Sequence, residues 1–271
     1  MDRLPTTRIG GIKVSKIVCG TNPFFGFSHF TRARDLWMRE YFTDDRIKQI
    51  MRRACELGVN AVVSGVQDRL HAILGDLRRE GLEMHWVCTP GGNNAKEVEE
   101  GVLWCKGHDV DICMPHQMYT DNNLLPAQND LLGYDGIASK IRSLGMVPGL
   151  STHRPETIVT VDKAGKDVEG YILPLNPLGF LCPFEVEWVQ RIVCNTPKPV
   201  IIIKTMAAGR ITPEIGLPFA LRAVKNTDPL ALGFSSILEV EEDLQLVRSI
   251  LSGRAEEMPL TTSRSKAVLG G

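Results

Sequence analysis

The chain of 271 residues carries a formal net charge of −1, and 43% of its residues are hydrophobic, which is typical of a globular domain with a sizeable core. A charge this close to neutral disfavours nucleic acid or an anionic membrane surface as the main partner, because both attract clustered positive charge. No apolar run approaches the ~20 residues that span a bilayer, and residues 1–5 lack the apolar core of a secretory signal. We therefore expect a cytoplasmic protein with a small-molecule substrate, no nucleic-acid or membrane partner, and self-association into a homo-oligomer as an open alternative.

Residues 7–14 form two short alternating runs on either side of Gly10-Gly11. Both positions of such a tight turn need positive φ, which glycine adopts without steric cost, so the pattern predicts a β-hairpin. If the strands that follow close into a barrel, we expect this hairpin to cover its bottom.

Beyond the hairpin, short apolar segments bounded by Gly, Pro and Asn alternate with amphipathic stretches. Short apolar runs of this kind are typical of strands buried on both faces. The predicted strands are 17–21, 61–64, 84–89, 110–114, 146–150, 170–175, 200–204 and 230–234. Apolar residues at helical spacing, with caps and glycine stops, predict helices over 44–57, 135–144, 183–194, 212–225 and 240–251.

Eight strand–helix units in a chain of this length indicate an α/β protein with a closed parallel (β/α)8 barrel, the TIM barrel, rather than an open doubly wound sheet. The first strand is not followed by Gly-x-Gly-x-x-Gly, which also disfavours a Rossmann fold. No linker-like stretch interrupts the pattern, so we predict a single domain over 1–271. Residues 253–271 have the composition of a loose C-terminal tail.

Several segments together resemble an aldo-keto reductase. Residues 8–23, RIGGIKVSKIVCGTNP, resemble the bottom hairpin and glycine-ended first strand of that family. Residues 110–116, VDICMPH, resemble its strand four, which ends in the catalytic histidine, here His116. The segment 149–156, the pair at 176–177 and residues 204–209 resemble the ends of strands five, six and seven. The resemblance implies an aldo-keto-reductase-like barrel and, if a nicotinamide cofactor binds, contacts to it from Ser151, Asn176 and Ser235.

The same alignment of motifs lacks the family's other catalytic side chains. Val63 stands where the catalytic aspartate is expected, and no tyrosine follows it before residue 119. Residues 88–90 replace the lysine that ends strand three, and Leu175 replaces the aromatic residue that stacks on nicotinamide. The acidic run 239–243 would repel a cofactor 2′-phosphate. The sequence therefore predicts a divergent member without ordinary nicotinamide-dependent reduction.

Three of the six histidines, His29, His116 and His153, follow predicted strands. In a (β/α)8 barrel the active site lies at the C-terminal ends of the strands, so we expect these side chains at one mouth. Imidazole is both the commonest metal ligand and the usual general base near neutral pH. Two hypotheses stay open: the three histidines hold Zn²⁺ or a similar divalent ion, or one or two of them act as acid and base without metal. A structural alternative for His153 is to cap the helix that begins near Pro155.

Lys204 ends a strongly apolar strand, where an unpaired ammonium is costly to bury, so we expect it to point into the polar mouth. There it could contact substrate or form a Schiff base. Arg210 follows the loop 207–209, which could bind phosphate through its backbone N–H groups. The predicted substrate-binding side chains are Asn22, His29, Gln67 and Arg210.

The leading functional prediction is an enzyme that acts on a small carbonyl or polyol compound, such as a sugar derivative, by isomerisation, epimerisation or elimination. In it His116 is base or ligand, His29 and His153 are ligands or partners, and Lys204 is an electrostatic stabiliser, so that His116, Lys204 and His153 form the catalytic set. The alternative is a divergent oxidoreductase that uses NAD(P)H. A third class is a binding protein without catalysis.

Overall fold

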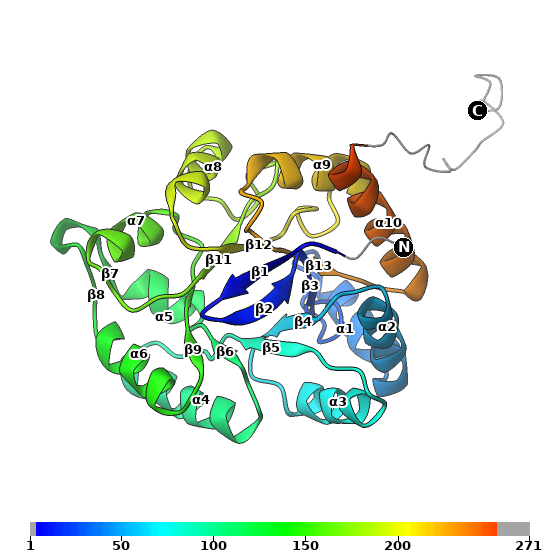
Figure 1. The fold of residues 1–271 in the computed structure, drawn as a ribbon, viewed down its shortest axis with the longest axis horizontal. Helices are drawn as coiled ribbons and strands as arrows, with labels where there is room; N and C mark the ends of the chain where they lie inside the picture. The colour runs from blue at the N-terminus through cyan, green and yellow to red at the C-terminus, as the bar shows by residue number, and fades with distance from the viewer. Residues whose placement is uncertain (1–3, 254–271) are drawn as a thin grey trace.

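The computed structural model describes residues 4–253, and within them a ring of parallel strands is surrounded by helices (Figure 1). The strand segments pair in the order β10-β11-β12-β13-β3-β4-β5-β6-β9. Their bounds are β3 Ile17–Gly20, β4 Ala61–Ser64, β5 His85–Cys88, β6 Ile112–Cys113, β9 Val147–Pro148, β10 Leu150–Ser151, β11 Tyr171–Pro174, β12 Val200–Ile203 and β13 Leu230–Gly233. Each lies within or next to a strand predicted from the sequence.

Gly149 divides the fifth barrel strand into β9 and β10, and this strand closes the ring. Its N–H donates to the carbonyl of Cys113 at 3.1 Å, while the N–H of Leu150 donates to Gly170 at 3.1 Å on the other side. A Cβ at Gly149 would lie 2.7 Å from Met114, so only glycine permits this close approach. The two ends of the sheet are thereby joined, and the predicted (β/α)8 architecture is confirmed.

Helices form the outer layer of the barrel (Figure 1). Each helix whose bounds were predicted from the sequence is present, and α1, α3, α4, α5 and α7 occur in addition. The bounds are α1 Arg32–Tyr41, α2 Asp44–Glu56, α3 Asp68–Arg79, α4 Ala95–Gly107, α5 Gln117–Asn122, α6 Tyr134–Ser143, α7 Glu156–Lys163, α8 Val186–Asn195, α9 Pro213–Ala223 and α10 Ile237–Ser252. No helix within residues 4–253 is long and apolar enough to cross a membrane.

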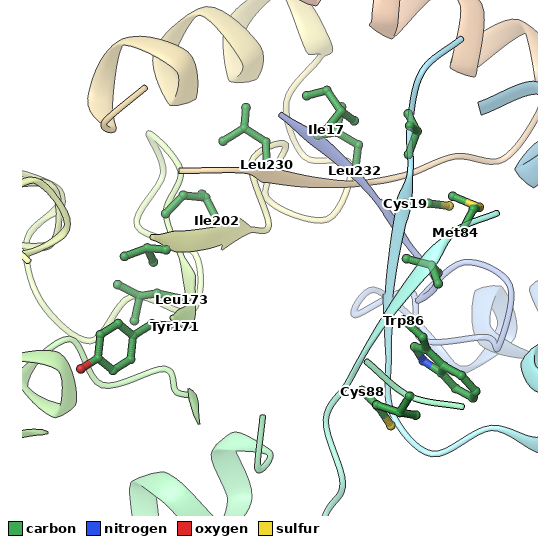
Figure 2. Close-up of a cluster of buried hydrophobic side chains, with 14 of the residues drawn as sticks. Ile17, Cys19, Met84, Trp86, Cys88, Tyr171, Leu173, Ile202, Leu230 and Leu232 are labelled. Atoms are coloured by element: carbon green, nitrogen blue, oxygen red, sulfur yellow. The ribbon is translucent and has the colours of Figure 1, made fainter. Parts of the chain in front are cut away.

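Side chains alternate between the barrel interior and the helix layer, as the two-residue period of a strand requires. On β4, Ala61 and Val63 belong to the interior cluster, whereas Val62 packs outward. The outer cluster also contains Ile17, Trp86, Leu173 and Ile202, drawn in Figure 2. Val63 and Ile203 are the partly buried interior residues nearest the C-terminal strand ends, so the floor beneath the mouth is apolar.

The N-terminal hairpin of β1 (Thr6–Ile9) and β2 (Ile12–Ser15) lies across one end of the barrel (Figure 1). Gly10 and Gly11 have φ of +54° and +92°, as the turn requires. Ile9 and Val14 are fully buried and pack on the interior cluster. The prediction that the hairpin covers the bottom is confirmed.

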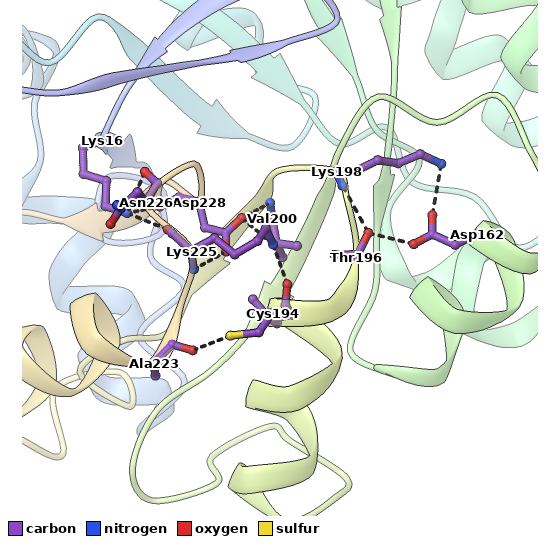
Figure 3. Close-up of polar contacts among 11 residues, drawn as sticks. Lys16, Asp162, Cys194, Thr196, Lys198, Val200, Ala223, Lys225, Asn226 and Asp228 are labelled. Carbon is purple, nitrogen blue, oxygen red and sulfur yellow. Dashed lines mark hydrogen bonds and ion pairs between the residues drawn. The ribbon is translucent and has the colours of Figure 1, made fainter.

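Lys16 fixes the hairpin to the turn between α9 and β13, as Figure 3 shows. Its Nζ donates to the carbonyls of Lys225 at 3.1 Å, Asn226 at 3.3 Å and Asp228 at 2.6 Å. The buried Asp228 carboxylate accepts from the N–H of Val200 at 2.9 Å. The bottom of the barrel is therefore closed by apolar packing and by a saturated polar network. The predicted tail, 253–271, lies outside the described residues except for Gly253, which caps α10.

Candidate active site

His116 lies at the C-terminal end of β6, two residues beyond the interior-facing Met114. Side chains two residues apart on a strand share a face, so this position continues the interior row into the mouth. His116 is also the N-cap of α5, where its Nδ1 accepts the N–H of Met118 at 3.3 Å. This contact favours the neutral tautomer with the proton on Nε2. Burial lowers the pKa of His116.

His153 follows β10 and is held by its backbone. Its N–H donates to both carboxylate oxygens of Asp121, at 3.1 and 3.3 Å, and Asp121 also accepts the hydroxyl proton of Thr152. The N-cap of α7 is Pro155, so His153 does not cap this helix, and that alternative was wrong. These hydrogen bonds of His153 use its backbone and leave its ring nitrogens available at the mouth.

The pKa of His153 is lowered to about 4 by burial and then by the positive charges of Lys204, His116 and His29. A Coulombic effect of this kind requires the groups to lie near one another. The three histidines predicted at the mouth, together with Lys204, therefore form one electrostatic cluster. These residues come from the loops after β3, β6, β10 and β12.

Lys204 follows β12 in a left-handed conformation, with φ of +64°. Its Nζ lies 3.3 Å from Nε2 and 3.5 Å from Nδ1 of His29. Within residues 4–253 no carboxylate lies at ion-pair distance from it, and burial lowers the pKa of its ammonium to about 8. Lys204 is thus a half-buried amine that faces an imidazole instead of an acid.

His29 reaches Lys204 from the loop between β3 and α1. It also has a left-handed backbone, with φ of +56°, and its Nδ1 lies 3.0 Å from the carbonyl of Phe27. A proton on Nδ1 would be donated to that carbonyl and would leave Nε2 as an acceptor for Lys204. Although the residue as a whole is exposed, partial burial of the ring and then the charge of Lys204 lower the pKa of His29.

The arrangement does not match a three-histidine metal centre. Residues 4–253 contain no group of three or more His, Cys, Asp and Glu side chains placed to hold a metal ion. His29 instead faces the Nζ of Lys204, where a cationic amine would compete with a metal for the same nitrogen. The metal hypothesis for His29, His116 and His153 is therefore without geometric support.

Arg210 is held by contacts within the chain, and its predicted contact with substrate or phosphate stays a prediction. Its guanidinium stacks over the rings of Phe180 at 4.0 Å and Phe30 at 4.9 Å. It also donates to the carbonyls of Ala207 at 3.0 Å and His29 at 2.9 Å. Arg210 thus ties three loops of the mouth together and supports the position of His29.

Two of the predicted cofactor contacts are used within the chain. The Asn176 side chain is fully buried, and its amide both donates to and accepts from the backbone of Phe180, at 2.9 Å each. The N–H of Ser235, just before α10, donates to the carboxylate of Glu239 at 2.6 Å. Asn176 and Ser235 thus already have partners within the chain, and their contact with a cofactor stays a prediction.

The remaining predicted residues lie at the correct end of the barrel. Ser151 is the last residue of β10 and is 4% exposed. Asn22 is exposed just after β3, and Gln67 precedes α3 without a capping contact from its side chain. Asn22 and Gln67 therefore stand at the rim of the mouth, which is where the sequence predicted substrate-binding side chains.

Two residues that shape the site were not singled out from the sequence. Asp121, in the short helix α5, holds the backbone of His153, and burial raises the pKa of its carboxyl. Phe180 covers Arg210 and meets the ring of His29 edge-on, with centroids 6.5 Å apart. Asp121 lies only five residues after His116, so the sequence could have placed it near the same strand end, whereas no local pattern points to Phe180.

No protein-family model and no curated protein sequence matches the chain. Among solved structures, apo Gox0644 is similar with a TM-score of 0.61 and 11% identity over 96% of this chain and 97% of that one. A Gox0644 variant in complex with NADPH is similar with a TM-score of 0.56 and 12% identity, over 96% of this chain and 97% of that one. A truncated 3-deoxy-D-arabino-heptulosonate 7-phosphate synthase from Thermotoga maritima gives 0.55 and 13%, over 93% of each chain. At these identities the likeness shows the fold alone: the chain is a TIM-barrel protein.

Proposed function

We propose that this barrel is an enzyme that moves protons on a small carbonyl or polyol compound, such as a sugar derivative, in an isomerisation, epimerisation or elimination. The observation that carries the proposal is the cluster of His29, His116, His153 and Lys204 at the C-terminal mouth. Residues whose pKa values are shifted by burial and by specific charged neighbours gather at catalytic sites. The apolar floor of Val63 and Ile203 suits a small substrate with its polar groups directed at the rim.

The chemical roles follow from the hydrogen bonds and charges of the cluster. Because the pKa of His153 is about 4, its ring is neutral at physiological pH, and negative charge developing on a bound substrate would offset its cationic neighbours and strengthen it as a base for a proton on carbon. His116, with Nδ1 occupied by the Met118 N–H, offers a proton on Nε2 to the substrate oxygen. Lys204 places positive charge where an enediolate oxygen develops. This assignment makes His116 a donor, whereas the sequence interpretation made it a base or ligand.

The same proposal treats the chain as a divergent relative of the aldo-keto reductases. The bottom hairpin, the single barrel and the histidine after strand four support that relation. The alternative function, NAD(P)H-dependent reduction, draws on the likeness to Gox0644 and its NADPH complex. The internal contacts of Asn176 and of the Ser235 N–H count against it, and so does the acidic Glu239 at the start of α10.

Proton exchange with solvent tests the proposed function. The protein is incubated in D₂O with a panel of aldoses, ketoses and small hydroxyaldehydes, and loss of the C–H signal next to the carbonyl is followed by NMR. We expect exchange with at least one compound, and His116→Asn should slow it by about 10²–10⁴-fold. His71→Asn, a change on α3 outside the mouth cluster, is the matched control and should leave the rate unchanged. Absence of exchange across the panel, or equal rates in both variants, contradicts the proposal.

A further inference from the structure

Lys204 differs from the other lysines of the described chain in what surrounds its amine. Lys48, Lys166, Lys198 and Lys225 each lie in an ion pair with a carboxylate. Lys16 is more buried than Lys204, but its Nζ donates to three backbone carbonyls at the bottom of the barrel. Burial lowers the pKa of both Lys16 and Lys204 to about 8. Of these two lysines, Lys204 is the one whose neutral form loses no carboxylate or carbonyl partner within residues 4–253.

The backbone around Lys204 holds the amine at the mouth at a conformational cost. Lys204, Ala207 and Ala208 have φ of +64°, +48° and +58°, and none of them is glycine. Each such residue costs about 1–2 kcal/mol, and strained residues of this kind gather at functional sites. The N–H of Ala207 donates to the carbonyl of Lys204 at 2.7 Å, which closes the turn. The turn directs Lys204 towards His29 instead of continuing the strand.

We propose that Lys204 is a nucleophile that forms a covalent iminium with the carbonyl carbon of a small aldehyde or ketone that carries a hydrogen on the adjacent carbon. This inference rests on the proposed function and deepens it, since the iminium then supplies the positive charge assigned above to the ammonium. His29, at 3.3 Å from Nζ, is placed to take a proton from the attacking amine.

The reaction balances without an oxidant or a further reactant. The lone pair of Nζ forms a C–N bond, and the carbonyl oxygen gains the proton that the nitrogen gives up through His29. The resulting carbinolamine takes a second proton and loses water, which leaves a C=N⁺ bond. His153 then removes a proton from the adjacent carbon, and that electron pair forms an enamine. Return of a proton to either face of that carbon restores the iminium, and addition of water releases the carbonyl compound, with the adjacent carbon epimerised or its hydrogen exchanged, together with the free amine.

Reductive trapping tests this inference on the full chain. The protein is mixed with glyceraldehyde, dihydroxyacetone or pyruvate and treated with sodium borohydride, and the modified lysines are located by mass spectrometry after digestion. We expect the reduced adduct at Lys204 at least tenfold above that at Lys198, a partly exposed lysine paired with Asp162 at the other end of the barrel, which measures background reaction in the same digest. His29→Asn should slow trapping while leaving the background at Lys198 unchanged. Lys204→Arg should remove the adduct, and circular dichroism checks that the variant is folded.

The proton-exchange assay is run on the same compounds, so the two proposals can fail separately. Exchange without an adduct at Lys204 overturns the iminium and leaves Lys204 as an ammonium that stabilises charge. An adduct without exchange supports the iminium and overturns the proposed isomerase or lyase chemistry. Adducts at Lys204 and Lys198 in equal yield contradict a nucleophile activated by its site.

Discussion

The groups whose protonated forms lower the pKa of His153 are Lys204, His116 and His29, all of which are cationic when protonated. A cluster of groups that each disfavour protonation of the others stays largely neutral near pH 7, apart from Lys204. Such a site favours negative charge in whatever it binds, which suits an enediolate or a carboxylate. Asp121 lies close by, but its carboxylate is used by the backbone of His153 and by Thr152.

Removal of the Lys204 charge should therefore raise the pKa of His153. In Lys204→Met one cause of the depressed pKa disappears, while burial of the ring remains. NMR titration of the imidazole C–H signals measures the change. Lys198→Met, which removes a lysine paired with Asp162 at the other end of the barrel, should leave the pKa of His153 unchanged. An unchanged or lower pKa in Lys204→Met would show that the two groups are not neighbours.

At the scale of elements, the mouth is built by loops that hold one another. Arg210, after β12, is stacked between Phe30 from the loop after β3 and Phe180 from the loop after β11. Its hydrogen bond to the carbonyl of His29 joins two of these loops directly. The Asn176 amide folds the third loop back on itself through Phe180. The position of His29 next to Lys204 thus depends on contacts from three separate strand ends.

We expect Arg210→Ala to loosen the loop that carries His29. The variant loses two hydrogen bonds and two cation–π contacts, which together exceed about 1.4 kcal/mol, so local opening becomes at least tenfold more frequent. Hydrogen–deuterium exchange should show this more frequent opening as faster exchange of the Phe27 N–H, which donates to the carbonyl of Asn22 in the native loop. Arg34→Ala is the control, because the Arg34 side chain lies over the ring of Phe30, at 5.3 Å, without a hydrogen bond to the loop that carries His29. Equal protection of the Phe27 N–H in both variants would show that Arg210 does not hold the loop that carries His29.

At the scale of the whole molecule, one buried acid links stability to pH. Asp243 on α10 is 4% exposed, and its pKa is raised to about 7 by burial and then by Glu239, Glu242 and Glu214. A carboxyl whose pKa is higher in the folded state stabilises that state while it is protonated. Its contribution is complete below the unfolded value of about 4 and is lost as the pH rises through about 7.

Because asparagine does not ionise, we expect Asp243→Asn to keep its stability as the pH rises through about 7, where the natural chain loses stability. In the natural chain the free energy of unfolding should decrease by about 4 kcal/mol from this group as the pH rises from about 4 to about 9. The variant should show a flatter profile and a higher stability near pH 8, as measured by urea unfolding at several pH values. Glu242→Gln, an exposed change on the same helix, should keep most of the slope. Parallel profiles for the natural chain and Asp243→Asn would contradict the assignment.

The sequence by itself determined the order of strands and helices, the parallel barrel and the hairpin at its bottom. These features depend on patterns between residues close in the chain: alternation around Gly10-Gly11, apolar runs of strand length, and caps such as Thr43 before α2. The end of the barrel that carries the candidate site also follows, since every strand in a parallel barrel ends at the same mouth. His29, His116, His153 and Lys204 were found in this way.

Only the tertiary structure decided which of these side chains meet. His29 and Lys204 are 175 residues apart, and both have a left-handed backbone. Neither is a glycine, so the sequence carries no local signal for this conformation. In the same way, only the structure shows that Arg210, Asn176 and Ser235, predicted as ligand contacts, also have partners within the chain. The physical reason is that periodic patterns fix the strands, whereas loop conformation and long-range packing fix the hydrogen-bond partners at their ends.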